Sequence, residues 1–396
     1  MPGKPKPQVA YFISHGTVRV NPHSPIWQQQ LPLNRHLAAA KDGLSICYGE
    51  YFSAVRAFLE NGGCELIGRA IREGIGSQPK PVQIRNIRVN LEKHGEFYHP
   101  AHLEVLAQHQ RFSFVLNVAV SETGIRHIRE EYFYLAKLNN EFKPSFLPRV
   151  YGIGEAAGAG SRRISMFLGQ WFEGFHEFHL TRNAPDGKNR IAFWHPWKRR
   201  LFLSFEQACE LYRQAARILT YYYNIETFAH IYGWHHAAGD FIVRVDKADL
   251  DVRLITVRRY IPLFSNREPS ESASRSPELI LQALLIFFLN LSIRMRLDRL
   301  DGVGNMVWAD SSSVGPTLAG FIEGLDLKPP VRSLPDTVGR SFRYYLSVCS
   351  RQDLYDLAYA VAEVFKPDTA EHHLLVQHID EHVETLNGAL QQLILT

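Results

Sequence analysis

Apolar and smaller or more polar residues alternate over one stretch of the chain, which predicts a β-strand. Phe112, Phe114, Leu116 and Val118 take every second position, and Ser113 and Asn117 are among the residues between them. Successive side chains of a strand point to opposite faces of a sheet, so this pattern fits a strand with one buried face. Less regular patterns predict further strands at residues 84–91, 102–106, 146–152 and 164–172.

Helical periodicity replaces alternation over much of the second half of the chain. Ser204 stands three residues before Gln207, the spacing of a capping box, and a stripe from Leu211 to Tyr222 follows at helical intervals. One helix is also predicted among the strands, at residues 125–139. Further helices are predicted at residues 278–297, 339–348, 353–364 and 371–395.

These elements predict an α+β protein with two lobes. Residues 81–180 are expected to form a small mixed lobe of antiparallel strands with one helix. Residues 181–396 are expected to form a mainly helical lobe. Residues 1–80 are interpreted as an N-terminal extension whose clearest element is a helix from Tyr51 to Leu59, and residues 77–81 as a linker.

Composition and charge narrow the class of protein. The chain has 396 residues, 45% of them hydrophobic, and a net charge of +4. Its basic residues form no long stripe, so we expect no nucleic-acid partner. The apolar run from Leu279 to Ile293 is interrupted by Gln282 and Asn290, which favours a buried helix over a membrane span. Four widely spaced cysteines without a Cys-x-x-Cys pair predict a reducing compartment, and we expect a cytoplasmic protein with no membrane partner.

One loop carries the pattern with the most chemical content. His236-x-x-Gly239-Asp240-Phe241 follows the capped helix, and a short apolar strand ending at Thr256 comes after it. Earlier in the chain, Glu131 lies on the single helix of the mixed lobe. In this order, the motifs resemble the protein-kinase-like phosphotransferases of the aminoglycoside and choline type. The resemblance covers roughly residues 84–264 and implies a two-lobed kinase-like fold.

The resemblance also implies roles for individual residues in the loop at 234–246. Asp240 would be the catalytic base that accepts the proton of an acceptor hydroxyl, with His235 or His236 bracing the loop. Magnesium would be held at Asp246, as a substitute ligand, and at Thr256, where the family has its metal-binding Asp. ATP would be the phosphate donor, and the acceptor would be a small molecule or a protein.

The nucleotide site implied by the resemblance falls in the mixed lobe. Glu131 would be a nucleotide-site residue. Asn117 stands where the family has the lysine that holds the donor phosphates, and Lys93 is a candidate to replace that lysine from a neighbouring strand. Positive charge provides most of the stabilisation in phosphoryl transfer, so its loss predicts a large fall in rate.

These departures leave two hypotheses open. The first is an atypical phosphotransferase that uses Asp240, and the second is a catalytically weakened, pseudokinase-like protein that binds a nucleotide or a partner. A third possibility is transfer of a different group, such as a nucleotidyl group.

Three smaller patterns add alternatives. His176 and His179 flank Glu177 with a spacing of three, one short of the zinc-protease motif. His235 and His236 with Asp240 form a candidate divalent-metal site. The pair Arg258-Arg259 is interpreted as solvated surface or as a site for a phosphate-bearing ligand.

Overall fold

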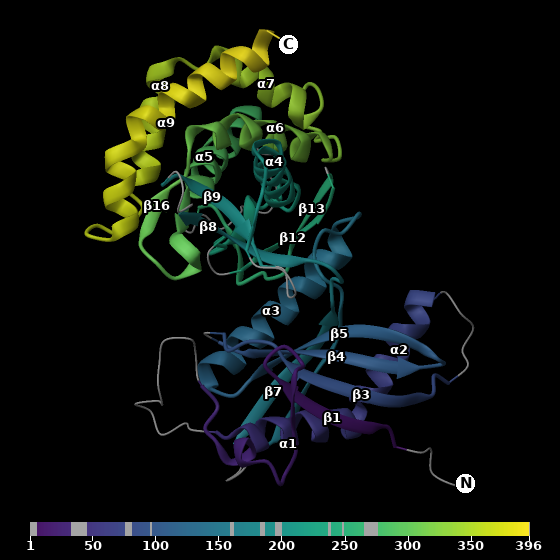
Figure 1. Ribbon diagram of the computed structural model, residues 1–396. Coiled ribbons are helices and arrows are strands. Elements are labelled where there is room, and N and C mark those ends of the chain that lie inside the picture. Colours follow the sequence, from purple (N-terminus) through teal and green to yellow (C-terminus); the bar gives the residue numbers. More distant parts are fainter. Residues whose placement is uncertain are drawn as a thin grey trace. The chain divides into compact units, whose positions relative to one another are not determined.

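The structure is a computed structural model that describes residues 6–32, 46–75, 81–95, 97–158, 162–182, 187–194, 200–236, 239–247, 249–264 and 276–395. Most of the expected linker at 77–81 and two residues of the 234–246 loop lie outside this part. The chain divides into two compact units, Met1–Glu173 and Gly174–Thr396. It is an α+β protein with an N-terminal sheet region and a C-terminal helical region (Figure 1).

The first unit is built on a seven-stranded sheet. Every pairing is antiparallel except the parallel pairing of β1 with β3. The predicted alternation at 112–120 corresponds to β5, where Leu116 and Val118 enter the core. In spatial order the strands are β2 (Val18–Val20), β1 (Gln8–Ile13), β3 (Ile84–Leu91), β4 (His99–Ala107), β5 (Gln110–Ala119), β7 (Arg163–Gln170) and β6 (Val150–Ala157).

The described residues within 1–80 belong to the same compact unit as the rest of the sheet. Strand β1 extends the sheet beyond β3, with Val9 opposite Ile87. The helices α1 (Tyr48–Phe58) and α2 (Cys64–Ile75) bury residues such as Phe52 in the same core as the strands. The third helix of the unit, α3 (Glu122–Glu141), packs against β5, β6 and β7. The extension was expected because the short β1 stretch has no alternation, and only its distant partner β3 makes it a strand.

The second unit contains six α-helices among the residues that the structure describes. Helix α4 begins with the predicted capping box, in which the Ser204 side chain accepts from the Gln207 N–H and the Gln207 side chain accepts from the Ser204 N–H. The helices are α4 (Phe205–Tyr221), α5 (Pro277–Arg296), α6 (Val314–Asp326), α7 (Val338–Val348), α8 (Arg351–Ala362) and α9 (Ala370–Leu395).

A five-stranded sheet also lies in the second unit, where the sequence predicted mainly helices. Its spatial order is β10 (Leu201–Phe202), β9 (Asn189–Phe193), β8 (His176–Arg182), β12 (Phe241–Asp246) and β13 (Asp249–Leu254). Two strand pairs complete the unit, β11 (Ala229–Tyr232) with β14 (Arg259–Pro262) and β15 (Leu297–Arg299) with β16 (Met306–Trp308). Strands β8 and β10 were not predicted because β8 is mostly polar and β10 has two residues.

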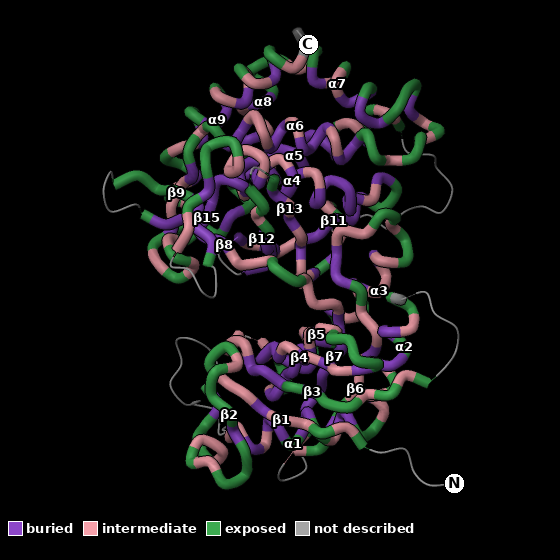
Figure 2. Tube along the Cα trace, turned by 45° about the vertical axis from the view of Figure 1, so that its right-hand side comes forward, coloured by how far each residue is buried: buried purple, intermediate pink, exposed green. Residues whose placement is uncertain are grey.

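Helix α5 contains the longest apolar run and is largely buried within the second unit (Figure 2). Of the described helices, it alone is long and apolar enough to cross a membrane by length and composition, and 61% of its most apolar stretch is buried. Such burial is typical of the central helix of a folded domain.

Helices α4 and α6 approach each other most closely at Gly320. A Cβ atom at this position would lie 1.9 Å from the carbonyl oxygen of Arg213. We therefore expect Gly320→Ala to lower the free energy of unfolding by about 2 kcal/mol, since the two helices must separate. Gly315, on the same helix, has open space at its Cβ position. Gly315→Ala should be neutral or stabilising by up to about 1 kcal/mol. Urea unfolding followed by circular dichroism measures both, and equal effects would contradict the close approach.

Candidate functional site

The candidate site is built around Asp240, at the end of a turn that leads into β12. Gly239 precedes it with a φ of +69°, a conformation that glycine adopts at little cost. A Cβ atom on Gly239 would also lie 2.9 Å from the carboxylate of Glu177. The backbone carbonyl of Asp240 accepts from the Ile255 N–H at 2.8 Å, which ties the turn to the segment after β13. The local chain path thus fixes the position of the Asp240 side chain.

The Asp240 carboxylate is buried, with 0% exposure, and accepts hydrogen bonds from three donors. The Thr256 hydroxyl donates to Oδ1 at 2.6 Å, and Nη2 of Arg258 donates to the same oxygen at 2.8 Å. The backbone N–H of His235 donates to Oδ2 at 2.8 Å. Arg258 also makes an ion pair with Asp240, and its own side chain is 30% exposed. Both carboxylate oxygens are therefore engaged within the second unit.

Thr256 and Arg258 lie in the short segment between β13 and β14, and both side chains donate to Oδ1 of Asp240. The structure thus brings together three of the residues singled out from the sequence, namely His235, Asp240 and Thr256. The role of Arg258 as the partner of Asp240 was missed. The sequence pattern that included it was the pair Arg258-Arg259, which was interpreted as solvated surface or as a site for a phosphate-bearing ligand.

His236 is buried in a cluster of aromatic rings. Its ring centroid lies within 6.2 Å of those of Phe178, Tyr212, Trp234 and Phe241. Burial lowers the pKa of His236 to about 3, with smaller contributions from neighbouring histidines. Neither ring nitrogen has a hydrogen-bond partner within the described part of the chain. The imidazole is therefore neutral and acts as an apolar ring that supports the loop.

His235 connects the loop to the C-terminal helix. Its Nε2 lies 3.6 Å from Oε1 of Glu371 on α9. The hydrogen bond from His235 lowers the pKa of Glu371 despite partial burial of the carboxyl. His235 therefore has two contacts that fix the loop: its backbone N–H donates to Asp240, and its side chain faces Glu371 on α9.

Asp246 lies at the far end of β12 from Asp240. It is exposed and stands opposite Asp249 at the tip of the β12–β13 hairpin. Six residues of extended strand separate the two carboxylates by roughly 20 Å, so one metal ion cannot contact both. Magnesium is bound by accessible oxygen ligands, whereas the Asp240 carboxylate is fully buried among three hydrogen-bond donors. The residues of this loop do not fit a magnesium site, and the described residues contain no cluster of three metal-ligating side chains.

His176 and His179 lie on β8, where a spacing of three places them on opposite faces of the strand. His179 is buried and His176 is half-buried. This geometry gives no support to a shared zinc ion.

The three residues expected at a nucleotide site lie in the first unit. Asn117 is on the interior strand β5, opposite Pro100 of β4, and is 9% exposed. Glu131 is on α3 and is 4% exposed. Lys93 follows β3 and is half-buried. Their roles toward a nucleotide stay predictions.

Comparisons with known proteins give little guidance. No protein-family model matches the chain. No curated protein matches its sequence. Among solved structures, the chain is similar to one described as WaaP in complex with acyl carrier protein, at 10% identity and a TM-score of 0.30. The match covers 68% of this chain and 86% of that chain. At this level the similarity supports no inference about activity.

Proposed function

We propose that this chain is a kinase-like protein that binds a nucleotide or a protein partner and does not transfer phosphate. The supporting observation is the state of Asp240, whose carboxylate is buried and accepts from Thr256, Arg258 and the His235 N–H. A catalytic base must offer an oxygen to the substrate hydroxyl. The Asp240 side chain is fully buried and protein donors contact both of its oxygens, so neither oxygen is accessible to a substrate.

The kinase-like part of the proposal is supported by one local contact. The resemblance assigns the catalytic base to Asp240 and the metal-binding position to Thr256, and these side chains meet at 2.6 Å. Thr256 donates a hydrogen bond there and supplies no carboxylate, the type of side chain through which proteins usually bind magnesium. The closeness of Asp240 and Thr256 is thus compatible with a kinase-like site. The residue at the metal-binding position, however, forms a hydrogen bond where the family's residue binds a metal.

Thermal unfolding with ATP tests the nucleotide part of the proposal. A ligand that binds only the folded chain raises its melting temperature. We expect ATP to raise the melting temperature equally in magnesium and in EDTA, because the loop offers no magnesium ligands. A shift that requires magnesium would contradict the proposal. If ATP does not change the melting temperature in either buffer, the proposed partner is a protein and not a nucleotide.

An atypical phosphotransferase is the second candidate, and the order of the loop residues favours it. His236, Gly239 and Asp240 follow the order of the family's loop, with one extra residue between the histidine and the glycine, and lead into a strand. In a phosphotransferase, the acceptor substrate would displace Arg258 and free Asp240 to act as the catalytic base. Arg258→Ala would then raise the rate of ATP consumption. If the chain only binds its ligand, the Arg258→Ala variant would consume no ATP.

The proposed location is the cytoplasm. The four cysteines, at positions 47, 64, 209 and 349, are free thiols, which fits a reducing compartment.

A further inference from the structure

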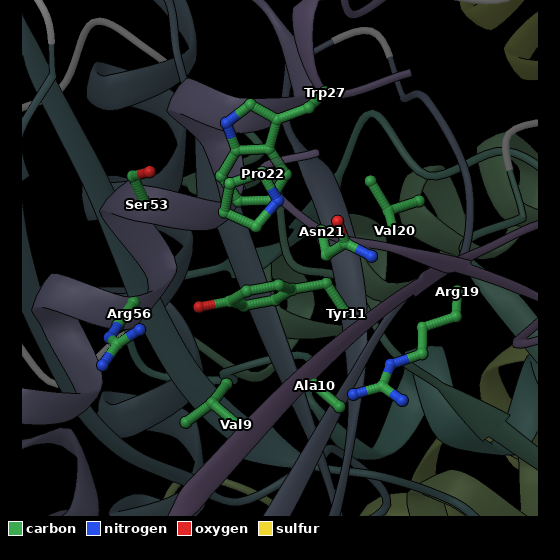
Figure 3. Close-up of a pocket in the computed structure, with 10 residues that line it drawn as sticks. All are labelled: Val9, Ala10, Tyr11, Arg19, Val20, Asn21, Pro22, Trp27, Ser53 and Arg56. Atoms are coloured by element: carbon green, nitrogen blue, oxygen red, sulfur yellow. The ribbon is translucent and has the colours of Figure 1, made fainter. Parts of the chain in front are cut away.

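A hollow of about 250 Å³ lies in the first unit, between strand β1 and helix α1. The end of β2 and the 3₁₀ turn η1 (Pro25–Gln28) supply the rest of its walls. Figure 3 shows the Tyr11 ring across the middle of the view, with Trp27 above it and Ser53 and Arg56 of α1 to one side. Pockets for drug-sized ligands measure roughly 300–1,000 Å³, so this smaller hollow suits a single ring.

The hollow meets an open edge of the seven-stranded sheet. Strand β2 pairs with β1 only at residues 11–13, so within the described chain Val9 and Ala10 have a strand neighbour only on the β3 side. Both residues line the hollow. Backbone N–H and C=O groups at such an edge are available to bind another molecule.

The edge stays open because β2 cannot continue along it. If the hairpin register continued, Asn21 would stand opposite Ala10, and Pro22 would stand opposite Val9. The Asn21 N–H donates instead to Oγ of Ser24 at 3.0 Å, and a proline has no N–H to donate. The place of the next strand residues is therefore left to a ligand.

Aromatic rings form one wall of the hollow. Tyr11 and Trp27 lie with ring centroids 5.8 Å apart and planes at 53°. Both rings pack against the fully buried Phe52, at centroid distances of 4.8 and 6.1 Å. The Trp27 ring also abuts Gly49, where a Cβ atom would lie 2.2 Å from Nε1. The two rings are thus held in place and offer apolar surface to a flat ligand.

The charged residues of the lining do not favour an ion. Arg19 stands opposite Phe12 in the β1–β2 register, so its side chain projects to the sheet face opposite that of Tyr11. Arg56 donates from Nε to Glu60 at 3.0 Å and forms an ion pair with it. The two guanidinium groups therefore do not converge in the hollow, and the lining suits a neutral ligand.

We infer that this hollow binds a small neutral ring that carries an amide N–H next to a C=O. The ring lies against Tyr11 and Trp27. Its N–H and C=O pair with the backbone at the open edge of β1, as the facing residue of an antiparallel strand would. The site belongs to the first unit and does not depend on the function proposed for Asp240.

Isothermal titration calorimetry on the full chain tests the inference with two matched probes. 2-Pyridone is a planar ring with an N–H next to its C=O, and N-methyl-2-pyridone is the same ring without the donor. We expect 2-pyridone to bind about tenfold more tightly, the scale of one lost hydrogen bond. The inference is overturned if 2-pyridone does not bind at millimolar concentration, or if the methylated ring binds as tightly.

A filling variant and a matched control locate the binding. Ser53 lines the hollow from an exposed position on α1, so Ser53→Phe should fill the hollow, keep the fold and abolish the binding of 2-pyridone. Ser347→Phe makes the same change at an exposed position on α7 in the second unit and should leave binding unchanged. Circular dichroism verifies that both variants are folded. Wild-type affinity in a folded Ser53→Phe variant would place the binding elsewhere and overturn the inference.

Discussion

Replacing Asp240 by alanine should lower the free energy of unfolding of the second unit by about 3 kcal/mol. The substitution removes a fully buried carboxylate and leaves Arg258, the Thr256 hydroxyl and the His235 N–H without their acceptor. Breaking a buried ion pair by removing one partner costs about 3–5 kcal/mol. The lower end applies because Arg258 is 30% exposed and can turn toward water.

Asp246→Ala is the matched control for this substitution. Asp246 is exposed at the tip of the β12–β13 hairpin, and a surface change of this kind usually alters stability by less than about 0.5 kcal/mol. Chemical unfolding monitored by circular dichroism compares the two variants. A similar small decrease in the free energy of unfolding for both variants would show that Asp240 is not bound by Arg258, Thr256 and the His235 N–H in the folded chain.

Replacing His236 by phenylalanine should stabilise the second unit more at pH 5 than at pH 7.5, by about 2 kcal/mol. Burial lowers the folded-state pKa of His236 to about 3, while an unfolded histidine has a pKa of about 6.5. Between these values the unfolded chain binds the extra proton, so stability from this group is present above pH 6.5 and is lost as pH falls. Phenylalanine fits the aromatic surroundings and does not titrate.

The expected difference follows from the 1.5 pH units between 6.5 and 5, at about 1.4 kcal/mol per unit. Urea unfolding of both chains at the two pH values measures it. Phe178→Leu perturbs the same aromatic cluster without a titrating group, so its effect on stability should be the same at both pH values. An effect of His236→Phe that does not change with pH would show that His236 titrates normally in the folded chain.

Local signals in the sequence were enough to predict some of the helices and strands. The Ser204–Gln207 capping box starts α4, and the alternation around Leu116 corresponds to β5. Strands that depend on distant partners were missed. Strand β8 pairs with β12, which lies more than sixty residues later in the chain, and Val243 stands opposite His176. The sequence of β8 is mostly polar and has no local pattern that predicts this pairing.

The candidate site was predicted in part. The segments that carry Asp240 and Thr256 were identified, and the structure brings the two side chains together. The metal role of Asp246 assumed that closeness in sequence means closeness in space, but the extended β12 carries it away from Asp240. The contact of Arg258 with Asp240 depends on how β13 ends, which a sequence pattern does not specify.

ATP consumption by the purified chain in the presence of magnesium, compared with that of Asp240→Asn, tests the central claim most directly. If protein donors hold both oxygens of Asp240, the wild type and the variant should both consume ATP no faster than a protein-free blank. A wild-type rate clearly above the blank that disappears in Asp240→Asn would show that this carboxylate acts as a base, and would contradict the account.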